Sequence, residues 1–449
     1  MKNLRLERAA SRVLNSKGTQ LGIEVIFVTP SGNVSGRSVI EHHTSSDFVA
    51  KFTSDYELVT MVSLVDYRYK IYPHRDNLKA IVQFFPLDVS ADKYLSSSPI
   101  FVDTYRALLF DNDDGATAAG SPITSSTETN SLDEERMIKI QLVEQAAEAL
   151  SYKAAQGTFR MTDNFNIVTG FLSEMIRQEA LTNPAAQVGI QMEPIDEVVV
   201  PREAVTIPPT VRLVDVPEFM QTKQGGLYSK GLGSFIHGNT WWIYPLFDTT
   251  RYLKTTRRLN IIQLRGAHAP IAEKSWLNEN GEITIVCTTA CKMQDISVSA
   301  GINKGQGTRF LKATGMFDAP TSGDPNKEVF NREEIMAEFQ VGKREDGNNI
   351  AMFSDNTITD NIANEYSKIA FRQGQMFMTI WQRSLARLLY PGMPLRLFYD
   401  KDGTTEVYDG TLLQVDEQWS SEATGMIQKN MIATAALVCF INKEVTKNG

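Results

Sequence analysis

Short apolar runs, alternating with polar residues and separated by turn residues, fill residues 20–110. LGIEVIFVT (21–29) ends at a Pro-Ser-Gly-Asn turn, and three further runs follow: YELVTMVSLV (56–65), KAIVQFFPL (79–87) and FVDTYRALLF (101–110). Runs rich in Val, Ile, Phe and Tyr with turn signals between them are typical of β-strands. The segment YRYKIYP alternates Tyr67, Tyr69 and Ile71 with basic residues and is expected to form a strand face that ends near Tyr72. This pattern predicts a first β-domain, a small barrel or sandwich, over residues 1–112.

Apolar and polar residues also alternate near the C-terminal end of the chain. GMPLRLFYD (392–400) is expected to be a strand, followed by an Asp402-Gly403 turn and a return strand that is interrupted at Asp409-Gly410. An Asp-Gly pair between alternating runs is a strong hairpin signal. The last apolar run, MIATAALVCFI (431–441), is expected to be a buried strand that completes a second β-domain over residues 371–449.

The region between the two β-rich ends is mixed. Residues 113–131 contain almost no large apolar side chain and are expected to be a linker or exposed loop, because such a segment buries too little surface to offset its ordering entropy. Residues 132–255 are expected to be a mixed α/β part that could share strands with both β-domains. Within it, apolar residues at helical spacing predict an amphipathic helix over 163–177, capped by Thr162 or Asp163.

Residues 193–211 contain four prolines. Because proline is excluded from central strands, this stretch is expected to form an extended connector. Glycine-rich loops and a few short strands in residues 256–370 suggest an inserted, loop-rich middle domain. The fold class predicted from these patterns is a β-rich α+β protein with several domains, with a β-domain at each end and a smaller α/β middle part.

Composition narrows the classes of function. The chain has 449 residues with 45 basic and 53 acidic side chains, a formal net charge of -8. A mildly acidic protein is a poor candidate for sequence-specific nucleic-acid binding, which depends on Lys and Arg. Its three cysteines argue against a disulfide-built scaffold. The charged N-terminal residues are not expected to be a signal peptide, and the longest apolar run is far shorter than the roughly 20 residues that span a bilayer. No membrane contact is predicted.

A search for catalytic and metal-binding motifs returns nothing. The chain has no G-x-S-x-G and no G-x4-G-K-[ST] motif, and its five histidines show no metal-ligand spacing. His42 and His43 are adjacent, so on a strand they would point to opposite faces, and a surface pair is favoured. Scattered carboxylates leave a glycosidase-type pair open. No catalytic residue, metal site or cofactor is therefore predicted.

The most unusual stretch is GNTWWIYPLFDTTRY, residues 238–252, which we call the aromatic segment. Trp241 and Trp242 are adjacent, and Tyr244 and Phe247 follow. Three interpretations compete: a packed core strand, a subunit interface, in which Trp and Tyr are enriched, and an exposed platform for sugars or bases. As a strand it would place Trp241 and Ile243 on one face and Trp242 and Tyr244 on the other, ending at Pro245.

Two long stretches together resemble a known family. LVEQAAEALSYKAAQGTFRMTDNFNIVTGFLSEMI is followed by TIPPTVRLVDVPEFMQTKQGGLYSKGLGSFIHGNTWWIYPLFDTTRY, and the C-terminal YPGMPLRLFYDKDGTTEVYDGTLLQV looks like a strand pair of a tail-tube-type barrel. The chain resembles the baseplate central hub proteins of contractile-tailed bacteriophages, over residues 20–445. In that family a helix, a Gly-Tyr turn and a W-x-x-Y-P-L segment precede the middle domain.

The resemblance implies that the two β-domains are tail-tube-like β-barrel domains, with the smaller α/β part between them. It also implies a structural virion protein without enzymatic activity. It implies a homotrimer whose six tube-like domains dock on the hexameric tail tube, while the threefold side accepts the trimeric central spike and other baseplate proteins surround it. The ring would line a DNA channel in the virion tail baseplate after assembly in the host cytoplasm. The alternatives are a tail-tip cell-wall hydrolase and a glycan- or receptor-binding tail protein that uses Trp241, Trp242 and Tyr244.

Overall fold

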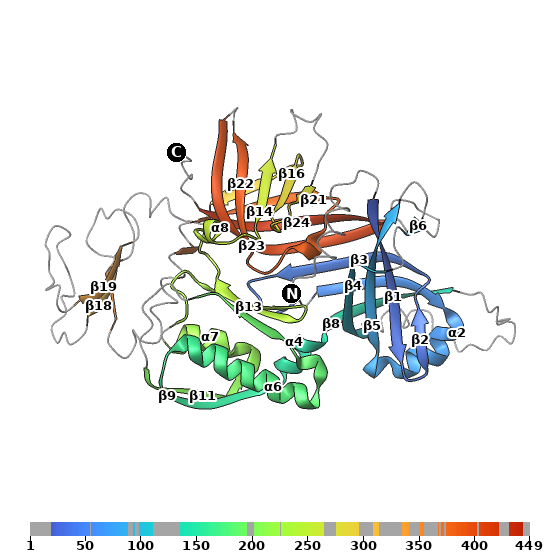
Figure 1. Cartoon of the computed structure of the whole chain (residues 1–449), viewed down its shortest axis with the longest axis horizontal. Coiled ribbons are helices and arrows are strands. Elements are labelled where there is room, and N and C mark those ends of the chain that lie inside the picture. The colour runs from blue at the N-terminus through green and yellow to red at the C-terminus, as the bar shows by residue number, and fades with distance from the viewer. Residues whose placement is uncertain are drawn as a thin grey trace.

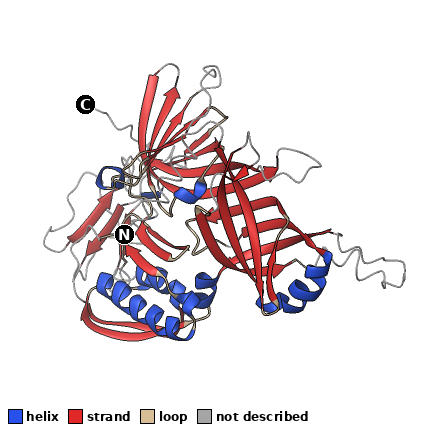
Figure 2. Cartoon of the chain, turned by 45° about the vertical axis from the view of Figure 1, so that its right-hand side comes forward, coloured by secondary structure: helices blue, strands red, loops and turns tan. Residues whose placement is uncertain are grey.

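The chain folds into a β-rich α+β protein in which strands far outnumber helices (Figure 2). The computed structural model describes residues 19–53, 55–88, 93–94, 98–110, 135–194, 202–224, 226–264, 275–295, 309–313, 335–340, 350–353, 367, 370–371, 374–401, 404–421 and 431–442. The predicted linker at 113–131 therefore lies outside the described residues.

Most strands belong to one 16-stranded sheet. Its N-terminal half is antiparallel and has the order β3-β4-β8-β7-β5-β1-β2, with β6 paired to β5. The strands of this half are β1 (Thr19–Thr29), β2 (Gly32–Ser35), β3 (Ser38–Asp47), β4 (Asp55–Ser63), β5 (Lys79–Asp88), β6 (Lys93–Tyr94), β7 (Phe101–Leu109) and β8 (Glu135–Glu144). Burial alternates along β4 and β8, as the period of two in the sequence predicts.

In the C-terminal half of the sheet, β14 lies parallel to both β16 and β22. The other strand pairs of this half are antiparallel. Its strands are β14 (Leu259–Gln263), β15 (Ser275–Leu277), β16 (Ile283–Cys287), β17 (Lys292–Asp295), β21 (Gly374–Gln382), β22 (Pro394–Lys401), β23 (Thr404–Ser421) and β24 (Met431–Asn442). Figure 1 shows these strands above the rest of the molecule, with β23 and β24 reaching across toward β3.

The long strand β23 joins the two halves. Its residues Thr404–Thr411 pair with β22, and Gln414–Ser420 pair with β3. The predicted interruption at Asp409-Gly410 is wrong, because β23 runs through it. The glycine is needed there since a Cβ at Gly410 would lie 2.3 Å from the carbonyl oxygen of Phe440 on β24. The prediction of two closed barrels is also wrong for the described strands, because β23 carries both halves in one branched sheet, and no path of pairing closes into a ring.

Helices and short strands of residues 145–245 form a separate layer, which we call the helical layer (Figure 1). Its members are α4 (Gln145–Ser151), β9 (Ala154–Thr162), α5 (Asn164–Asn166), the π-helix η3 (Ile167–Phe171), α6 (Leu172–Thr182), η4 (Pro184–Ala186), β10 (Gly189–Met192), β11 (Arg202–Arg212), η5 (Leu213–Asp215), α7 (Val216–Lys223), β12 (Leu232–His237) and β13 (Thr240–Pro245). The short helix α8 (Arg251–Lys254) that follows lies beside β22 of the C-terminal half. In Figure 1, α6 and α7 lie between the β9–β11 ribbon and β13.

The predicted helix at 163–177 is present and continues to Thr182. Asp163 caps it by accepting a hydrogen bond from the Asn166 backbone N–H at 2.8 Å. The helix buries Ile167, Val168, Leu172 and Ile176 at the predicted spacing, although its middle turn is π-helical. Those side chains form a second hydrophobic core, distinct from the core of the large sheet.

Two local predictions are wrong. Residues 64–77 are helical rather than a strand: α2 (Leu64–Asp66), the π-helix η1 (Tyr67–Ile71) and the 3-10 helix η2 (Tyr72–Asn77) connect β4 to β5, so the tyrosines do not share one sheet face. Pro208 and Pro209 lie inside strand β11 rather than in a connector. They are tolerated because, among the described strands, β11 pairs with β9 alone, and because the register shifts between Ile207 and Val211.

The remaining described elements are η7 (Ala386–Leu388) and a three-stranded sheet of β18 (Arg309–Ala313), β19 (Ile335–Gln340) and β20 (Ile350–Phe353). Among the described residues, no helix combines the length and the apolar character that a membrane span requires.

Candidate functional site

The aromatic segment lies where the helical layer meets both halves of the large sheet. Strand β13 pairs antiparallel with β12 and parallel with β10, so it is the central strand of a three-stranded sheet. Gly238 makes the β12–β13 turn with a φ of 59°, a conformation that favours glycine. The strand ends at Pro245, as predicted, and both of its edges are paired because it is the central strand.

One face of β13 belongs to the helical layer. Trp241 is 1% exposed and packs in the core of that layer together with Ile243. The indole Nε1 of Trp241 donates a hydrogen bond to Ser234 Oγ at 3.0 Å. The only polar atom of this large side chain is thus satisfied, which a buried Trp requires. Trp241 is an internal packing residue of this chain.

The opposite face of β13 contacts the C-terminal half. Trp242 is half-buried and stacks on Tyr390, with ring centroids 4.7 Å apart and an interplanar angle of 21°. The Tyr390 hydroxyl donates to the Arg257 carbonyl oxygen at 2.7 Å, and the Arg257 guanidinium lies 5.0 Å from the Tyr390 ring centroid. Burial raises the pKa of Tyr390 to about 12, so it remains a neutral donor.

Tyr244 occupies a slot made by two glycines. A Cβ at Gly233 would lie 2.3 Å from its ring, and a Cβ at Gly392 would lie 1.9 Å from it. The hydroxyl of Tyr244 donates to the Phe48 carbonyl oxygen at 3.4 Å, and the Arg251 guanidinium lies 5.2 Å from the ring. Burial raises the pKa of Tyr244 well above its ordinary range. This ring therefore contacts the helical layer and both halves of the sheet.

Phe247 extends the same contact. Its ring lies 4.9 Å from the Phe440 ring of β24 and 5.1 Å from that of Phe371. Gly231, with a φ of 81°, leaves room for it, because a Cβ there would approach the Phe247 ring to 2.6 Å. Of the four predicted residues, Trp241 is in the core of the helical layer, and Trp242, Tyr244 and Phe247 pack against the sheet.

Charged residues lie at the C-terminal end of the aromatic segment. The buried Asp248 carboxylate accepts hydrogen bonds from Lys230 Nζ and Thr250 Oγ1, each at 2.8 Å. Burial by itself would raise the pKa of Asp248, but these hydrogen bonds outweigh it and the pKa is lowered. Arg251, 3% exposed, pairs with Glu193 and donates to the Gly392 carbonyl oxygen at 2.8 Å. Both charges are satisfied inside the protein.

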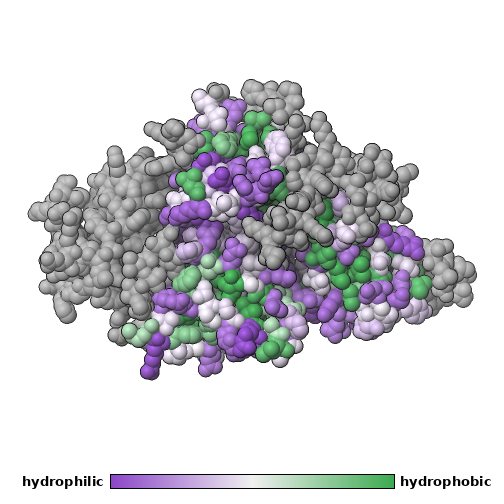
Figure 3. All heavy atoms as spheres, viewed as in Figure 1, coloured by the Kyte–Doolittle hydropathy of each residue, from purple (hydrophilic) through white to green (hydrophobic). Residues whose placement is uncertain are grey.

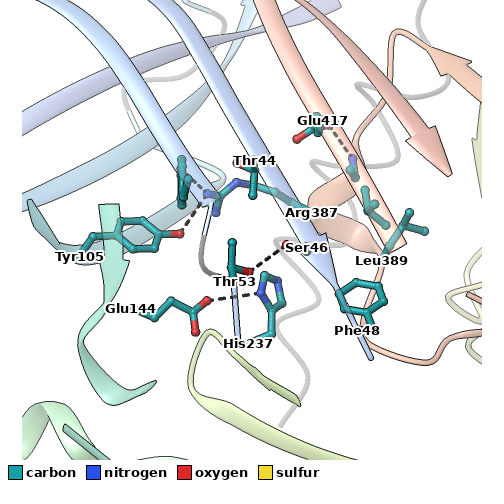
Figure 4. Close-up of a pocket in the computed structure, with 13 residues that line it drawn as sticks. Thr44, Ser46, Phe48, Thr53, Tyr105, Glu144, His237, Arg387, Leu389 and Glu417 are labelled. Carbon is teal, nitrogen blue, oxygen red and sulfur yellow. Dashed lines mark hydrogen bonds and ion pairs between the residues drawn. The ribbon is translucent and has the colours of Figure 1, made fainter. Parts of the chain in front are cut away.

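A second polar cluster, which sequence reasoning missed, surrounds Arg387 of η7 (Figure 4). Arg387 forms an ion pair with Asp103, and it donates to the hydroxyls of Tyr56 and Tyr105 at 3.2 and 3.3 Å. Its guanidinium lies 4.1 Å from the Phe84 ring centroid. Arg387 and its partners are more than 280 residues apart in the chain, so no local pattern could have indicated the cluster.

The cluster borders a small cavity of about 50 Å³. Strands from both halves and from the helical layer line it: Thr44 and Ser46 of β3, Glu417 of β23, His237 of β12 and Glu144 at the end of β8. In Figure 4, Glu144 and His237 face each other below Arg387. The Glu417 carboxylate accepts from Ser384 Oγ at 2.7 Å and from the Ala386 backbone N–H at 3.1 Å. These contacts fix the position of η7.

The adjacent histidines of β3 point to opposite faces, as predicted. His43 faces outward and contacts Asp416 at 2.7 Å. His42 is 1% exposed, with its Nε2 2.7 Å from the Tyr56 hydroxyl, so the prediction of a surface pair is wrong for this residue. The reason is that the inner face of β3 packs on the Phe84 and Trp419 rings. Burial, followed by the nearby positive charge of Arg387, holds the pKa of His42 well below 6.5.

The buried environment of His42 predicts that the folded protein loses stability as the pH falls. The folded protein keeps His42 neutral, whereas the unfolded chain takes up a proton below about pH 6.5. Stability from this residue is complete above pH 6.5 and is lost as the pH falls toward the lowered folded pKa, by up to about 1.4 kcal/mol per pH unit. Urea unfolding between pH 7.5 and 5 is expected to show this slope, and His42→Gln to remove it. His43→Gln is the control that keeps the slope; an unchanged slope in His42→Gln would contradict the prediction.

The described residues contain no group of three or more His, Cys, Asp or Glu side chains that could hold a metal ion. The cysteines Cys287 and Cys439 are buried, and burial raises the pKa of Cys439. Most polar groups of the aromatic segment and of the Arg387 cluster are bonded to one another, whereas Glu144 Oε2 is buried without a partner among the described residues. Their arrangement is suited to fixing parts of the chain in one relative position.

Several solved structures, at low sequence identity, are similar to this chain. No protein-family model matches the sequence, and no curated protein sequence is significantly similar to it. The structure is similar to the 43 kDa tail protein of prophage MuSo2 from Shewanella oneidensis, with a TM-score of 0.47 and 9% identity over 94% of this chain and 99% of that chain. It is similar to a tail protein from Neisseria meningitidis MC58, with a TM-score of 0.45 and 10% identity over 94% of this chain and 98% of that chain.

A third similar structure is the E. coli c3393 protein, described as a type VI secretion component that resembles the T4 tail proteins gp27 and gp5. Its TM-score is 0.41 at 8% identity, over 93% of this chain and 77% of that chain. This chain is thus similar in structure to phage tail proteins along nearly its whole length.

Proposed function

We propose that this chain is a non-enzymatic structural protein of a contractile phage-type tail, and that it serves there as the baseplate hub. The observation that carries the proposal is the placement of the aromatic segment. The residues that carry the sequence resemblance, from Trp241 to Phe247, pack between the helical layer and the large sheet and contact both of its halves. A protein that holds two rings of different symmetry together needs its own parts in one fixed arrangement.

The continuity of the sheet supports the same proposal. Strand β23 carries hydrogen bonds from β22 at one end to β3 at the other, and β24 pairs with it along most of its length. Force applied to one half would pass to the other through the backbone hydrogen bonds of β23. Pulling the two halves apart would require breaking several of these hydrogen bonds together. Apolar areas at the surface of the helical layer and of the N-terminal half (Figure 3) suit a subunit that contacts other proteins.

In this proposal the chain forms a homotrimer that joins the hexameric tail tube to the trimeric central spike and lines the DNA channel. A closed trimer with two equivalent parts per chain can present six positions to a hexamer. The net charge of -8 suits a channel wall along which DNA slides without sequence-specific binding. The proposed location is the virion tail baseplate, with assembly in the host cytoplasm and no membrane contact. The five-part division of the chain at residues 112, 131, 255 and 370 belongs to this proposal.

Light scattering combined with electron microscopy of the purified protein tests the assembly. We expect a mass near three times 50.2 kDa and ring-shaped particles with a central lumen. A stable monomer without a lumen would contradict the hub assignment.

Two further assays separate the hub from the alternatives. Turnover of purified peptidoglycan would contradict the non-enzymatic assignment. A glycan panel that shifts tryptophan fluorescence would favour a receptor-binding protein, although Trp241 and Tyr244 are only 1% and 2% exposed and thus poorly placed as a platform.

A further inference from the structure

A polar groove of about 590 Å³ adjoins the small cavity described above, and Tyr105 and Glu144 line both. Its volume is in the range of ligand sites, roughly 300–1,000 Å³. One wall is the start of β7, and another is the first turn of α4. The residue before α4, Glu144, lines both the groove and the small cavity. The opposite wall comes from residues 184–189 and from the β12–β13 turn at Gly238 and Asn239.

The β7 wall presents an unpaired strand edge. Ala107 donates its backbone N–H to the Leu78 carbonyl oxygen at 2.9 Å, which sets the phase of the ladder with β5. In an antiparallel pair such bonding alternates, so the backbone N–H and C=O groups of Val102 and Thr104 point to the other edge. Strand β8 covers that edge only from Tyr105 onward. In the described part of the chain, residues 101–104 pair with β5 alone.

Strand β8 stops there because the chain turns into α4 after Glu144. The groove therefore occupies the space that a longer β8 would fill. Val102 and Thr104 both line it, and Val102 is 52% exposed. An added extended segment at this edge could form hydrogen bonds to both residues, as in β-strand addition.

Glu144 supplies a charge for such a segment. It is 8% exposed, and its Oε1 accepts from the Gly238 backbone N–H at 3.1 Å and lies 3.4 Å from His237 Nδ1. Its Oε2 is buried and has no hydrogen-bond partner among the described residues. In Figure 4 this second oxygen points away from Arg387. A buried carboxylate oxygen without a partner is costly, so a cationic donor from a ligand would be strongly favoured.

We propose that this groove binds an extended segment of a partner polypeptide that carries a lysine or arginine. The basic side chain pairs with Glu144 Oε2, and the backbone pairs with Val102 and Thr104. Charge selects the occupant: Glu144 contributes a carboxylate to the lining of the groove, and the lining residues include no Lys, Arg or His. The carboxylate of Asp103, which also lines the groove, is already paired with Arg387. The inference concerns this groove alone and holds whether or not the chain is a baseplate hub.

Binding of a short labelled peptide to the full-length protein tests the charge. The probe is capped Thr-Val-Lys-Val-Thr, compared with the same peptide carrying norleucine in place of lysine, by fluorescence anisotropy. Wild type is expected to bind the lysine peptide at least about tenfold more tightly, because a hydrogen bond to a charged group contributes that much. Glu144→Gln is expected to lose this preference. Glu174→Gln, an exposed carboxylate that pairs with Arg177, is the matched control and should keep it.

The backbone part of the proposal has its own test. Val102→Pro removes an N–H that faces the groove and is not used by β5, so it should weaken both peptides, whereas Val102→Ala should not. N-methylation of alternate peptide amides provides a test without any change in the protein: one of the two alternate sets should abolish binding and the other should not. Absence of binding at millimolar peptide, equal affinity for lysine and norleucine, or indifference to both N-methylation patterns would overturn the proposal.

Discussion

Replacing Trp241 by alanine is expected to lower the free energy of unfolding by about 3–5 kcal/mol, the range for truncating a large buried aromatic side chain. Trp241 is 1% exposed, lies in the core of the helical layer and loses its hydrogen bond to Ser234 on truncation. The adjacent Trp242 is only half-buried, and its main partner is the stacked ring of Tyr390. Trp242→Ala is therefore expected to cost less, about 1–3 kcal/mol, with an additional loss of assembly.

Urea unfolding followed by circular dichroism measures both losses, and light scattering measures assembly. Trp276→Ala serves as the control, because Trp276 is 38% exposed on the outermost strand β15 and its truncation should have a small effect. Equal losses at Trp241 and Trp242 would contradict the description of β13 as a strand with one fully buried face. Normal folding and assembly of Trp242→Ala would mean that this ring belongs to an exposed platform.

Gly392→Ala is expected to destabilise the protein by about 2–5 kcal/mol. Two effects add. The φ of 67° at Gly392 costs an alanine about 1–2 kcal/mol. In addition, the new Cβ would lie 1.9 Å from the Tyr244 ring, and forcing extra volume into a packed core costs about 1–3 kcal/mol. Because the Tyr244 ring fills a slot between backbone segments, it cannot move aside easily.

A matched glycine separates the two effects. Gly238 has a similar φ of 59°, but a Cβ there would meet nothing within 4 Å. Gly238→Ala should therefore show the conformational cost alone. In a double-mutant cycle, Gly392→Ala should cost less in a Tyr244→Leu background than in wild type, because the smaller side chain leaves room for the methyl group. If the two glycine variants lose equal stability, the close packing of Tyr244 on Gly392 is wrong.

Strand positions followed from the sequence because they depend on a local period. The runs at 21–29, 79–87 and 431–441 are strands in the structure, and the helix that starts after Asp163 has the predicted cap and buried stripe. The alternation Trp241, Trp242, Ile243, Tyr244 predicted a strand covered on both faces. In each case the pattern within about ten residues carries the information, because burial on one face must repeat with the period of the element.

Where local pattern and tertiary context disagreed, the context prevailed. Tyr67 and Tyr69 alternate with basic residues like a strand, yet the chain crosses from β4 to β5 there and forms helical turns. Pro208 and Pro209 argued against a strand, but β11 is an edge strand and a shift in its register accommodates them. The preference of a few residues for helix or strand contributes little free energy compared with the packing of whole elements.

The sequence by itself determined that the protein is β-rich, where most strands lie and which aromatic residues are central. Only the tertiary structure decided that β23 joins the halves in one sheet, that Arg387 reaches Asp103, and that the end of β8 leaves a groove beside Glu144. The physical reason is distance along the chain. Strand pairing and ion pairs between residues hundreds of positions apart depend on how complete surfaces fit, and no local pattern encodes that fit.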